Sequence, residues 1–324
     1  MKHFKSFMAP QLQQYADYRL ALGYAKKGIK PPLLAFDRYL IAQKVTWDQL
    51  QPVFFLQLRA KIADNPKTVN NILMAIRSFF QFLVRQGICV QNPLKDIPSL
   101  PKRYFVPFVF SPAQTEHLLQ AAGKNIRKTP KYFSIDMAIY LTIVLLARCG
   151  MRINEPLRLR HDHYCRQDGT VYIEKTKFRK DRLIPVPKIA LTQIENYLAV
   201  RRASRTDDQN PYLLAARKQR RLRDDQVRDT FHQAVEDIGL SRAKQTIGNI
   251  TFGKPVPHSL RHTFAINTLK QIKDRGQSTQ RALPVLAVYM GHRKYQYTAA
   301  YLKVSSADHL TGLIEFAKSQ LDVI

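Results

Sequence analysis

Hydrophobic residues recur every three or four positions along residues 68–83, which is the spacing of one face of an α-helix. The apolar stripe consists of Val69, Ile72, Leu73, Ile76, Phe79, Phe80 and Leu83. Gly87 follows as a stop signal, and Asn92-Pro93 breaks the chain soon afterwards. The pattern predicts a first domain over residues 1–97 that is built from several helices.

Prolines interrupt the helical pattern between residues 97 and 112. Pro98, Pro101, Pro107 and Pro112 fall in this short stretch, and proline is not tolerated inside a helix. Residues 98–111 are therefore expected to form an extended linker. Lys102 and Arg103 give it a positive charge that would suit a strap along a phosphate backbone.

A second domain is expected over residues 112–324. Ser111-Pro112 is a helix-start signal, and helical patterns cover roughly 112–124 and 134–149. Residues 170–174 and 182–186 are typical of short strands joined by a basic turn, and helices resume from about residue 188 to the end. The predicted class is mainly α with a small antiparallel sheet: a helical N-terminal domain followed by a mixed α/β domain.

The net charge of the chain indicates what kind of molecule the protein binds. There are 52 Lys and Arg residues against 24 Asp and Glu, a formal net charge of +28. Nucleic acid is the natural partner for such a chain, because neutralised phosphates release counterions. Charge alone leaves open a ribosome-like structural protein or a membrane-surface protein.

Cysteine content and hydropathy restrict the cellular setting. Cys89, Cys149 and Cys165 form no CxxC pair, which disfavours a disulfide framework and a zinc site. The first residues lack an apolar signal core, and the longest uncharged apolar run, residues 137–147, is too short to span a bilayer. These features predict a soluble, cytoplasmic protein.

Five short features follow one another in the second domain, and each alone is a weak signal. In order they are Arg152 after Gly150, Lys177 in the basic turn, His258-Ser259-Leu260-Arg261, Gly291-His292, and Tyr301. Taken singly, such residues are more often solvated charges, surface-helix pairs, capped turns or core aromatics.

Together these features supply the groups that phosphodiester transfer requires. The reaction needs a nucleophile, a proton donor for the leaving oxygen, and cations around a five-coordinate phosphorus. Arg152 and Arg261 can each hold non-bridging oxygens with a planar guanidinium group. Lys177, on its turn, can protonate the leaving 5′ oxygen, and His258 and His292 supply imidazoles. No carboxylate cluster of metal-binding type accompanies them, so we expect no metal and no other cofactor.

Four tyrosines crowd the segment that would carry the nucleophile. Tyr289 sits in an apolar run, which suggests core packing. Tyr295 and Tyr297 follow His292 too closely to leave a turn and then a helical turn before the hydroxyl. Tyr301 lies nine residues beyond His292, a length that lets both side chains reach one phosphate. Tyr301 is therefore the expected nucleophile.

The order Arg, Lys, HxxR, Gly-His, Tyr resembles that of the tyrosine recombinases, or phage-type integrases, and of their two-domain Xer-like members in particular. The resemblance covers nearly the whole chain, because the segment "TVNNILMAIRSFFQFLVRQGICVQNPLKDI" is similar to the helical core-binding domain of that family. It implies that residues 1–97 bind DNA and that residues 112–324 form the catalytic domain.

The resemblance also implies a mechanism and an assembly. Tyr301 would form a 3′-phosphotyrosine and release a 5′ hydroxyl, which a partner strand's hydroxyl later reverses without ATP. Glu155 matches an acidic position that supports the first arginine, although a solvent-facing helix residue is the alternative. The family assembles as a homotetramer on two duplexes, and the free protein could be a monomer. A role for a mobile element or replicon, and association with the nucleoid, would follow.

Some features depart from the family pattern or leave alternatives open. Pro156 directly follows Glu155, which is unusual inside a helix. Arg179 and Lys180 in the turn, and Arg220 and Arg221 in the basic segment 217–223, are expected to contact DNA, although a solvated charge run remains open for the latter. Two other functions also remain: a type IB topoisomerase that relaxes supercoils, and an inactive DNA-binding accessory protein.

Overall fold

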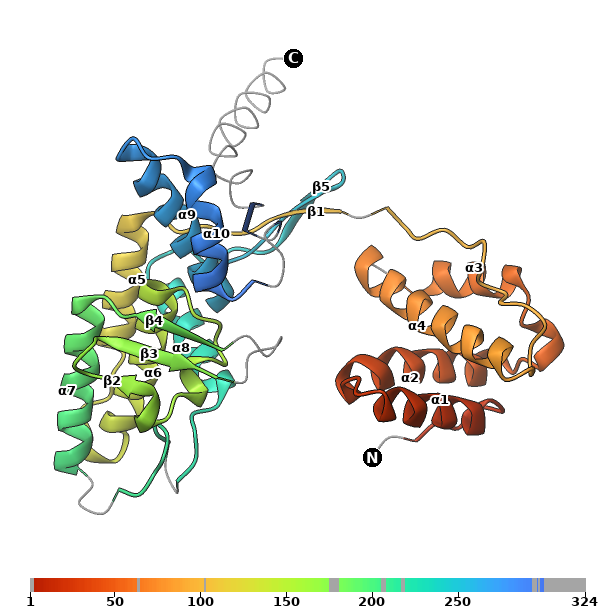
Figure 1. Ribbon diagram of the computed structural model, residues 1–324, viewed down its shortest axis with the longest axis horizontal. Helices are drawn as coiled ribbons and strands as arrows, with labels where there is room; N and C mark the ends of the chain where they lie inside the picture. The colour runs from red at the N-terminus through yellow and green to blue at the C-terminus, as the bar shows by residue number, and fades with distance from the viewer. Residues whose placement is uncertain are drawn as a thin grey trace. The chain divides into compact units, whose positions relative to one another are not determined.

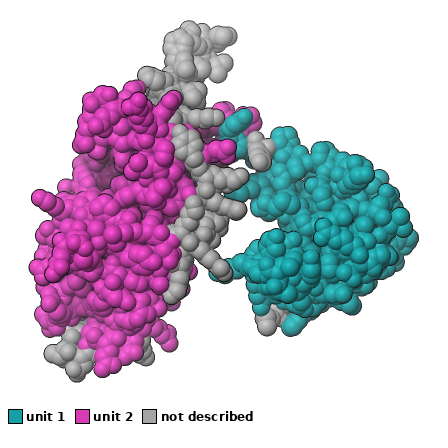
Figure 2. Space-filling model, viewed as in Figure 1, with its two compact units in different colours: residues 1–104 teal, residues 105–324 magenta. Residues whose placement is uncertain are grey.

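The computed structural model describes residues 3–62, 65–101, 103–174, 181–204, 208–216 and 219–292, together with residues 296, 298 and 299. The chain divides into two compact units, residues 1–104 and 105–324, which have different colours in Figure 2. Each unit has its own cluster of buried apolar side chains, so each is a separately packed body.

The first unit consists of helices whose apolar faces share one core (Figure 1). Its elements are α1 (Ala9–Ala21), α2 (Lys26–Gln43), the 3-10 turn η1 (Trp47–Gln49), α3 (Pro52–Lys61) and α4 (Pro66–Arg85). Helix α4 begins after Asn65, whose side chain accepts a hydrogen bond from the backbone N–H of Lys67. Pro66 occupies the first turn, where its missing N–H costs nothing.

The helical stripe predicted for residues 68–83 is confirmed. All seven of its apolar residues are buried in α4, and α4 packs against α1 and α2. The exposed positions of the helix are mostly polar, with Met74 as a large apolar exception. The stripe therefore organises the core of the first unit.

The second unit surrounds one long apolar helix. Its elements are β1 (Tyr104–Val106), α5 (Pro112–Lys124), α6 (Pro130–Cys149), the 3-10 turns η2 (Pro156–Arg158) and η3 (His161–His163), β2 (Tyr164–Cys165), β3 (Thr170–Ile173), β4 (Arg182–Pro185), α7 (Lys188–Ser204), α8 (Asp224–Asp237), β5 (Gln245–Ile247), β6 (Ile250–Phe252), α9 (Pro257–Asp274) and α10 (Thr279–Met290). Helix α6 packs against α5, α7, α8 and α9. It is long and apolar enough to cross a membrane by length and composition, but 67% of that stretch is buried within the unit, as expected for a core helix.

A small antiparallel sheet lies beside these helices. Strand β3 pairs with β2 on one side and β4 on the other, and Val171 faces Ile184 across the ladder with both side chains buried. The strands predicted at residues 170–174 and 182–186 are confirmed, as is the class, mainly α with small sheets. The basic turn at residues 175–180 lies outside the described residues.

Two expectations about the second unit need correction. Residues 188 to the end are not helical throughout, because β5 and β6 form an antiparallel hairpin to which β1 adds a third strand. The segment 98–111 is not linker along its whole length. Phe108 and Phe110, with 8% and 1% of their surface exposed, belong to the core of the second unit, since burying two aromatic rings outweighs the freedom of a loose connection.

Candidate active site

The first arginine of the site lies just after the central helix. Helix α6 ends at Cys149, and Gly150 follows with φ +58°, a conformation that glycine adopts without strain. A Cβ at this glycine would overlap the ring of Phe264 on α9. The chain therefore packs tightly against α9 at Gly150, two residues before Arg152.

Glu155 holds Arg152 in place. The Arg152 Nη1 atom donates to Glu155 Oε1 at 2.9 Å, and the backbone N–H of Arg152 donates to Oε2 at 2.9 Å. The Glu155 side chain is only 9% exposed, whereas that of Arg152 is 27% exposed. Glu155 is thus a buried support and not a solvent-facing residue. Pro156 is accommodated because it is the first residue of the 3-10 helix η2 and lies outside any α-helix.

A second arginine, Arg182, joins this pair, and sequence reasoning did not select it. Arg182 is the first residue of β4 and is buried. Its Nη1 and Nη2 atoms donate to the two Glu155 oxygens at 3.2 and 2.9 Å, and its Nε donates to the carbonyl oxygen of Tyr289 at 2.7 Å. The only signal in the sequence was a charged residue at the start of an otherwise apolar strand.

Helix α9 contributes the HxxR pair. His258 and Arg261 are three residues apart and therefore share one face near the helix start. Arg261 is 1% exposed, and it donates from Nη1 to the carbonyl oxygen of Gly150 at 2.7 Å and from Nη2 to that of Met290. Arg261 thereby ties together the two turns that carry Arg152 and His292.

The Gly-His turn follows α10. Gly291 has φ +61°, and its carbonyl oxygen accepts a hydrogen bond from Arg152 Nη2 at 3.1 Å. The backbone N–H of His292 donates to the carbonyl oxygen of Ala287 at 2.9 Å, which closes the turn. On the side chain, His292 Nδ1 lies 2.8 Å from Oγ1 of Thr298, so the ring has a fixed orientation.

Burial and positive charge keep the imidazoles of the site neutral. Burial lowers the pKa of His258 to about 4, and the charges of Arg261 and Arg152 act in the same direction. Burial and Arg261 likewise lower the pKa of His292 to about 4. His262, whose ring meets that of His258 edge-on at 4.7 Å, has a pKa lowered to about 3 by burial, with His258 and Arg261 acting in the same direction. Neutral imidazoles can accept a proton.

Glu155 stays ionised beneath these cations. Burial by itself would raise the pKa of Glu155, but the hydrogen bonds and charge of Arg182 outweigh it, with help from the backbone of Arg152. The pKa is therefore held below its ordinary value. A buried carboxylate that two arginines share makes the surrounding cation cluster electrostatically tolerable.

Tyr289 packs in the core, as its sequence context suggested. Its ring stacks on Phe264 with centroids 5.4 Å apart, and burial raises the pKa of its hydroxyl. A buried phenol with a raised pKa is a poor nucleophile. Among the tyrosines of this segment, Tyr289 is thus part of the framework under the Gly-His turn.

The structure brings together Arg152, Glu155, His258, Arg261 and His292 from segments that are far apart in the sequence. Lys102, Lys177, Arg179, Lys180 and Tyr301 lie outside the described residues. Arg103, Arg220 and Arg221 are exposed. The last two line a cavity of about 490 Å³ that also touches Asn154, the neighbour of Glu155.

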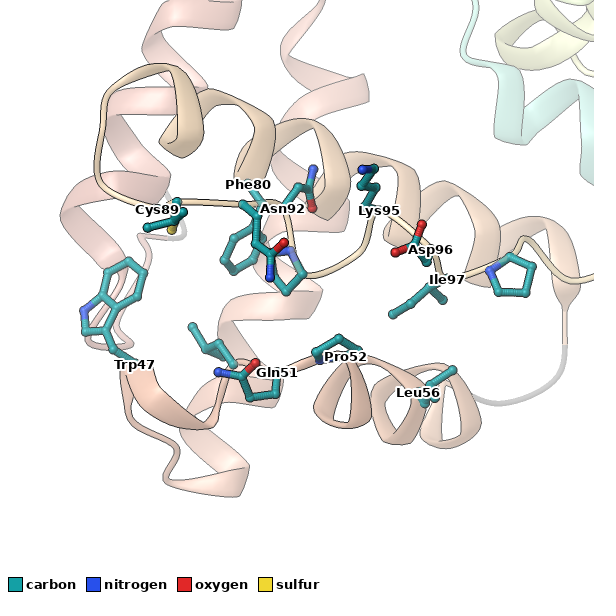
Figure 3. Close-up of a pocket in the computed structure, with 15 residues that line it drawn as sticks. Trp47, Gln51, Pro52, Leu56, Phe80, Cys89, Asn92, Lys95, Asp96 and Ile97 are labelled. Carbon is teal, nitrogen blue, oxygen red and sulfur yellow. The ribbon is translucent and has the colours of Figure 1, made fainter.

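The first unit has two hollows of different character. One, of about 480 Å³, lies between Trp47 and Leu56 on one side and residues 89–98 on the other (Figure 3), where Lys95 is followed by Asp96. The other, of about 750 Å³, lies between α1, α2 and α4 and is lined by Arg19, Lys27 and Arg38. Only the second combines three cations without a lining carboxylate, which favours a polyanion there.

The site combines two arginines with two imidazoles, in a mainly helical protein with a small sheet. This combination is typical of proteins that transfer phosphoryl groups. The sequence model of the phage integrase family matches residues 109–308. The chain therefore belongs to the phage integrase family of tyrosine recombinases, and the resemblance drawn from the motif order is confirmed. These recombinases are enzymes that act on DNA.

Individual relatives resemble the chain over most of its length. The putative integrase/recombinase y4rE of Sinorhizobium fredii is 28% identical and aligns over 98% of both chains. The tyrosine recombinase XerA of Pyrococcus furiosus is 26% identical over 97% of this chain and 96% of its own. Among solved structures, a lambda integrase tetramer bound to a Holliday junction superposes with a TM-score of 0.62 at 16% identity, covering 88% of this chain and 77% of that one. This last likeness concerns the fold.

Proposed function

We propose that the protein is a site-specific recombinase that cleaves and rejoins DNA through a covalent 3′-phosphotyrosine formed by Tyr301. The observation that carries the proposal is that three separate elements bring their side chains into one cluster. Arg152 follows α6, His258 and Arg261 lie on α9, and His292 follows α10. Such a cluster of cations and neutral imidazoles matches a phosphate undergoing substitution.

Each group has a part in the proposed reaction. The Tyr301 oxygen attacks phosphorus, its proton passes to the neutral imidazole of His258, and the bond to the 5′ oxygen breaks. Lys177 gives the departing oxygen its proton, which leaves a free 5′ hydroxyl. A 5′ hydroxyl of another strand then attacks the phosphotyrosine and restores both the DNA backbone and the tyrosine. The phosphotyrosine keeps the energy of the broken phosphodiester bond, so the scheme needs no ATP. The charge on the phosphate is met by the cationic side chains of the site.

The two arginines would divide the work at the phosphate. Arg152 is 27% exposed, so its guanidinium can meet a non-bridging oxygen directly. Arg261 is buried and bonds the backbone of the two turns. Its positive charge would stabilise the anionic transition state without touching the phosphate. Both would also favour the ionised form of the attacking tyrosine.

DNA contacts would extend over both units. In the first unit, Thr68, Asn71 and Ser78 share the face of α4 that looks into the basic hollow with Lys27 and Arg38, and such side chains bind phosphates and base edges. In the second unit, Arg220 and Arg221 would add contacts beside the Arg152 loop, residues 150–155 between α6 and η2. Lys102 and Arg103, and Arg179 and Lys180, would lie along the duplex. We also infer assembly as a homotetramer on two duplexes.

The cellular role follows from this chemistry. A cytoplasmic enzyme of this family would act on DNA of the nucleoid, and we place its substrate in a mobile element or replicon. The type IB topoisomerase alternative shares the strand chemistry but needs no partner site. An inactive accessory protein would bind DNA without forming a covalent bond.

One experiment tests these alternatives without knowledge of the recognition sequence. The protein is incubated with nicked duplexes of randomised sequence, the mixture is denatured, and DNA that stays covalently attached is sequenced. The wild type should enrich one sequence and become attached to it at a 3′ phosphate. The duplex that carries this enriched sequence is called the selected duplex below. Tyr301→Phe should yield no adduct, whereas Tyr289→Phe, Tyr295→Phe and Tyr297→Phe should each yield it.

The outcomes separate the candidates. An adduct without sequence enrichment, together with relaxation of plasmids lacking any enriched site, would indicate a topoisomerase. No adduct with the wild type, despite tight binding, would indicate the inactive protein. An adduct that survives Tyr301→Phe and maps to another tyrosine would overturn the assignment of the nucleophile. The enriched sequence, compared with the DNA that flanks the gene, would test the mobile-element role.

A further inference from the structure

Arg182 bonds both Glu155, which holds Arg152, and the end of α10, and yet it is none of the residues selected from the five sequence features. Its side chain is 7% exposed, and a buried guanidinium requires partners for its charge and its N–H groups. Both Glu155 oxygens and the Tyr289 carbonyl meet this need, at 2.7 to 3.2 Å. The three contacts connect β4, the Arg152 loop and the end of α10.

The Gly-His turn is shaped around this guanidinium. A Cβ at Gly291 would lie 2.9 Å from Arg182 Nη1, so the guanidinium would have to shift to make room for it. Glycine at this position therefore serves two purposes: it adopts φ +61° and it leaves room for Arg182. Displacement of Arg182 would disturb Gly291, whose carbonyl receives a hydrogen bond from Arg152, and thus His292 next to it.

We propose that Arg182 is a positioning residue of the recombination reaction, which acts through the Glu155 carboxylate to hold Arg152 and the Gly291–His292 turn in register around the phosphate. The inference rests on the proposed strand-transfer function. Arg182 touches no reacting atom in this scheme. Its bidentate grip fixes the carboxylate, the carboxylate fixes Arg152, and its bond to the Tyr289 carbonyl fixes the end of α10.

A structural role alone would not produce the pH dependence expected of this arrangement. Among the described residues, the charged and titratable groups that act on Glu155 are Arg152 on its own loop, Arg182 on β4, and Arg261 and His258 on α9. Without Arg182, burial would dominate and raise the pKa of Glu155. Protonation of Glu155 as the pH falls would then release Arg152, so the rate of a neutral variant should fall in mildly acidic solution and recover partly at mildly alkaline pH.

Arg201 offers a matched control in the same unit. Its side chain is 4% exposed, and it bonds Asp208 at 2.6 Å and the carbonyl oxygens of Asn210, Tyr212 and Leu213. Arg201→Gln therefore removes a buried, carboxylate-paired arginine whose bonds to Asp208 and these carbonyls involve none of the proposed catalytic residues. It should lower the thermal midpoint without changing the pH profile of cleavage.

The test measures single-turnover adduct formation on the selected duplex, the Kd of that duplex, and the thermal midpoint. Arg182→Gln should slow adduct formation on the order of 10- to 100-fold, the cost of a small misplacement at a reacting centre, with little change in Kd. The ratio of its rate to that of the wild type should rise with pH. Arg182→Lys should also be slow, because one ammonium cannot make the bidentate contact, but its ratio should be flat with pH.

The outcomes are distinguishable from a failure of the proposed function. If the wild type forms no adduct, strand transfer itself is wrong. If the wild type forms it and Arg182→Gln matches its rate, the positioning role is wrong. A rate loss that is constant with pH and equal to that of Arg201→Gln would also overturn it, as would an Arg182→Lys rate equal to the wild type. The lysine variant decides the matter if the glutamine variant does not fold.

Discussion

The imidazole of His292 is held by the hydroxyl of Thr298, with Nδ1 and Oγ1 2.8 Å apart and Thr298 wholly buried. A hydrogen bond at one ring nitrogen fixes the orientation of a histidine ring. Thr298 stands three residues before Tyr301 in the sequence. The contact therefore connects the Gly-His turn directly to the segment of the proposed nucleophile.

Thr298→Val should slow adduct formation, because the isosteric methyl group cannot bond Nδ1 and the His292 ring is free to turn. We expect a loss of about 10-fold, as for other small misplacements, with the Kd of the selected duplex unchanged. Rates and gel-shift affinities measured side by side check this. Thr298→Ser keeps the hydroxyl and should stay close to the wild-type rate; equal losses in both variants would assign the effect to the packing around residue 298 and not to the hydrogen bond.

Lys177→Ala should slow cleavage by about 10²- to 10⁴-fold, the usual contribution of a general acid, and should leave site binding nearly intact. The proposed task of Lys177 is to protonate the departing 5′ oxygen. A substrate with sulfur in place of that oxygen needs no acid, so cleavage by Lys177→Ala should recover on it. Arg152→Gln, which removes a phosphate contact, should remain slow on both substrates. Lack of recovery by Lys177→Ala would remove the lysine from this role.

The local elements could be predicted because their signals are local. The stripe from Val69 to Leu83 determines one helix face, and Ser111 with Pro112 marks the start of α5, which ends at Lys124 as expected. Helix α6 begins at Pro130, four residues before the predicted start. The aromatic residues there carried no apolar periodicity, whereas Pro130 itself was the available start signal.

The hairpin of β5 and β6 was missed although the sequence contained a signal for it. Ile247-Gly248-Asn249-Ile250 places a two-residue turn between β-branched residues, which is typical of a tight hairpin. Three-residue strands are too short to show alternation clearly. Arg182 and Thr298 had no such signal, because their roles depend on contacts with residues that only the fold brings near.

The basic segment beside the Arg152 loop should contribute to the salt dependence of DNA binding. The logarithm of affinity is expected to fall linearly with the logarithm of salt concentration, with a slope set by the number of neutralised phosphates. Replacing Arg220 and Arg221 by alanine should reduce that slope by about one for each lost phosphate contact. Arg166 is exposed and lies 3.5 Å from Glu195, so Arg166→Ala is the control and should leave the slope unchanged. An unchanged slope would show that the segment is only a solvated charge run.

The neutral imidazoles of the site should make the stability of the DNA-free protein depend on pH. In the folded state the pKa of His262 is about 3 and those of His258 and His292 are about 4, whereas an unfolded histidine has a pKa of about 6.5. Between these values the unfolded chain takes up protons that the folded protein refuses. The stabilisation is therefore complete above the unfolded pKa and is lost as the pH falls toward the folded values.

We expect the free energy of unfolding to decrease steadily as the pH is lowered from neutrality, since each unit of pKa difference corresponds to about 1.4 kcal/mol. His262→Gln removes one of the three groups and should make the decrease shallower, even if the variant is less stable at neutral pH. His117→Gln, an exposed position on α5, should leave the slope as it is. Denaturant unfolding at several pH values measures both. The selected duplex should stabilise the wild type more in mild acid than at neutrality, because a phosphate beside His258 and His292 raises their pKa; equal stabilisation at both pH values would place the phosphate elsewhere.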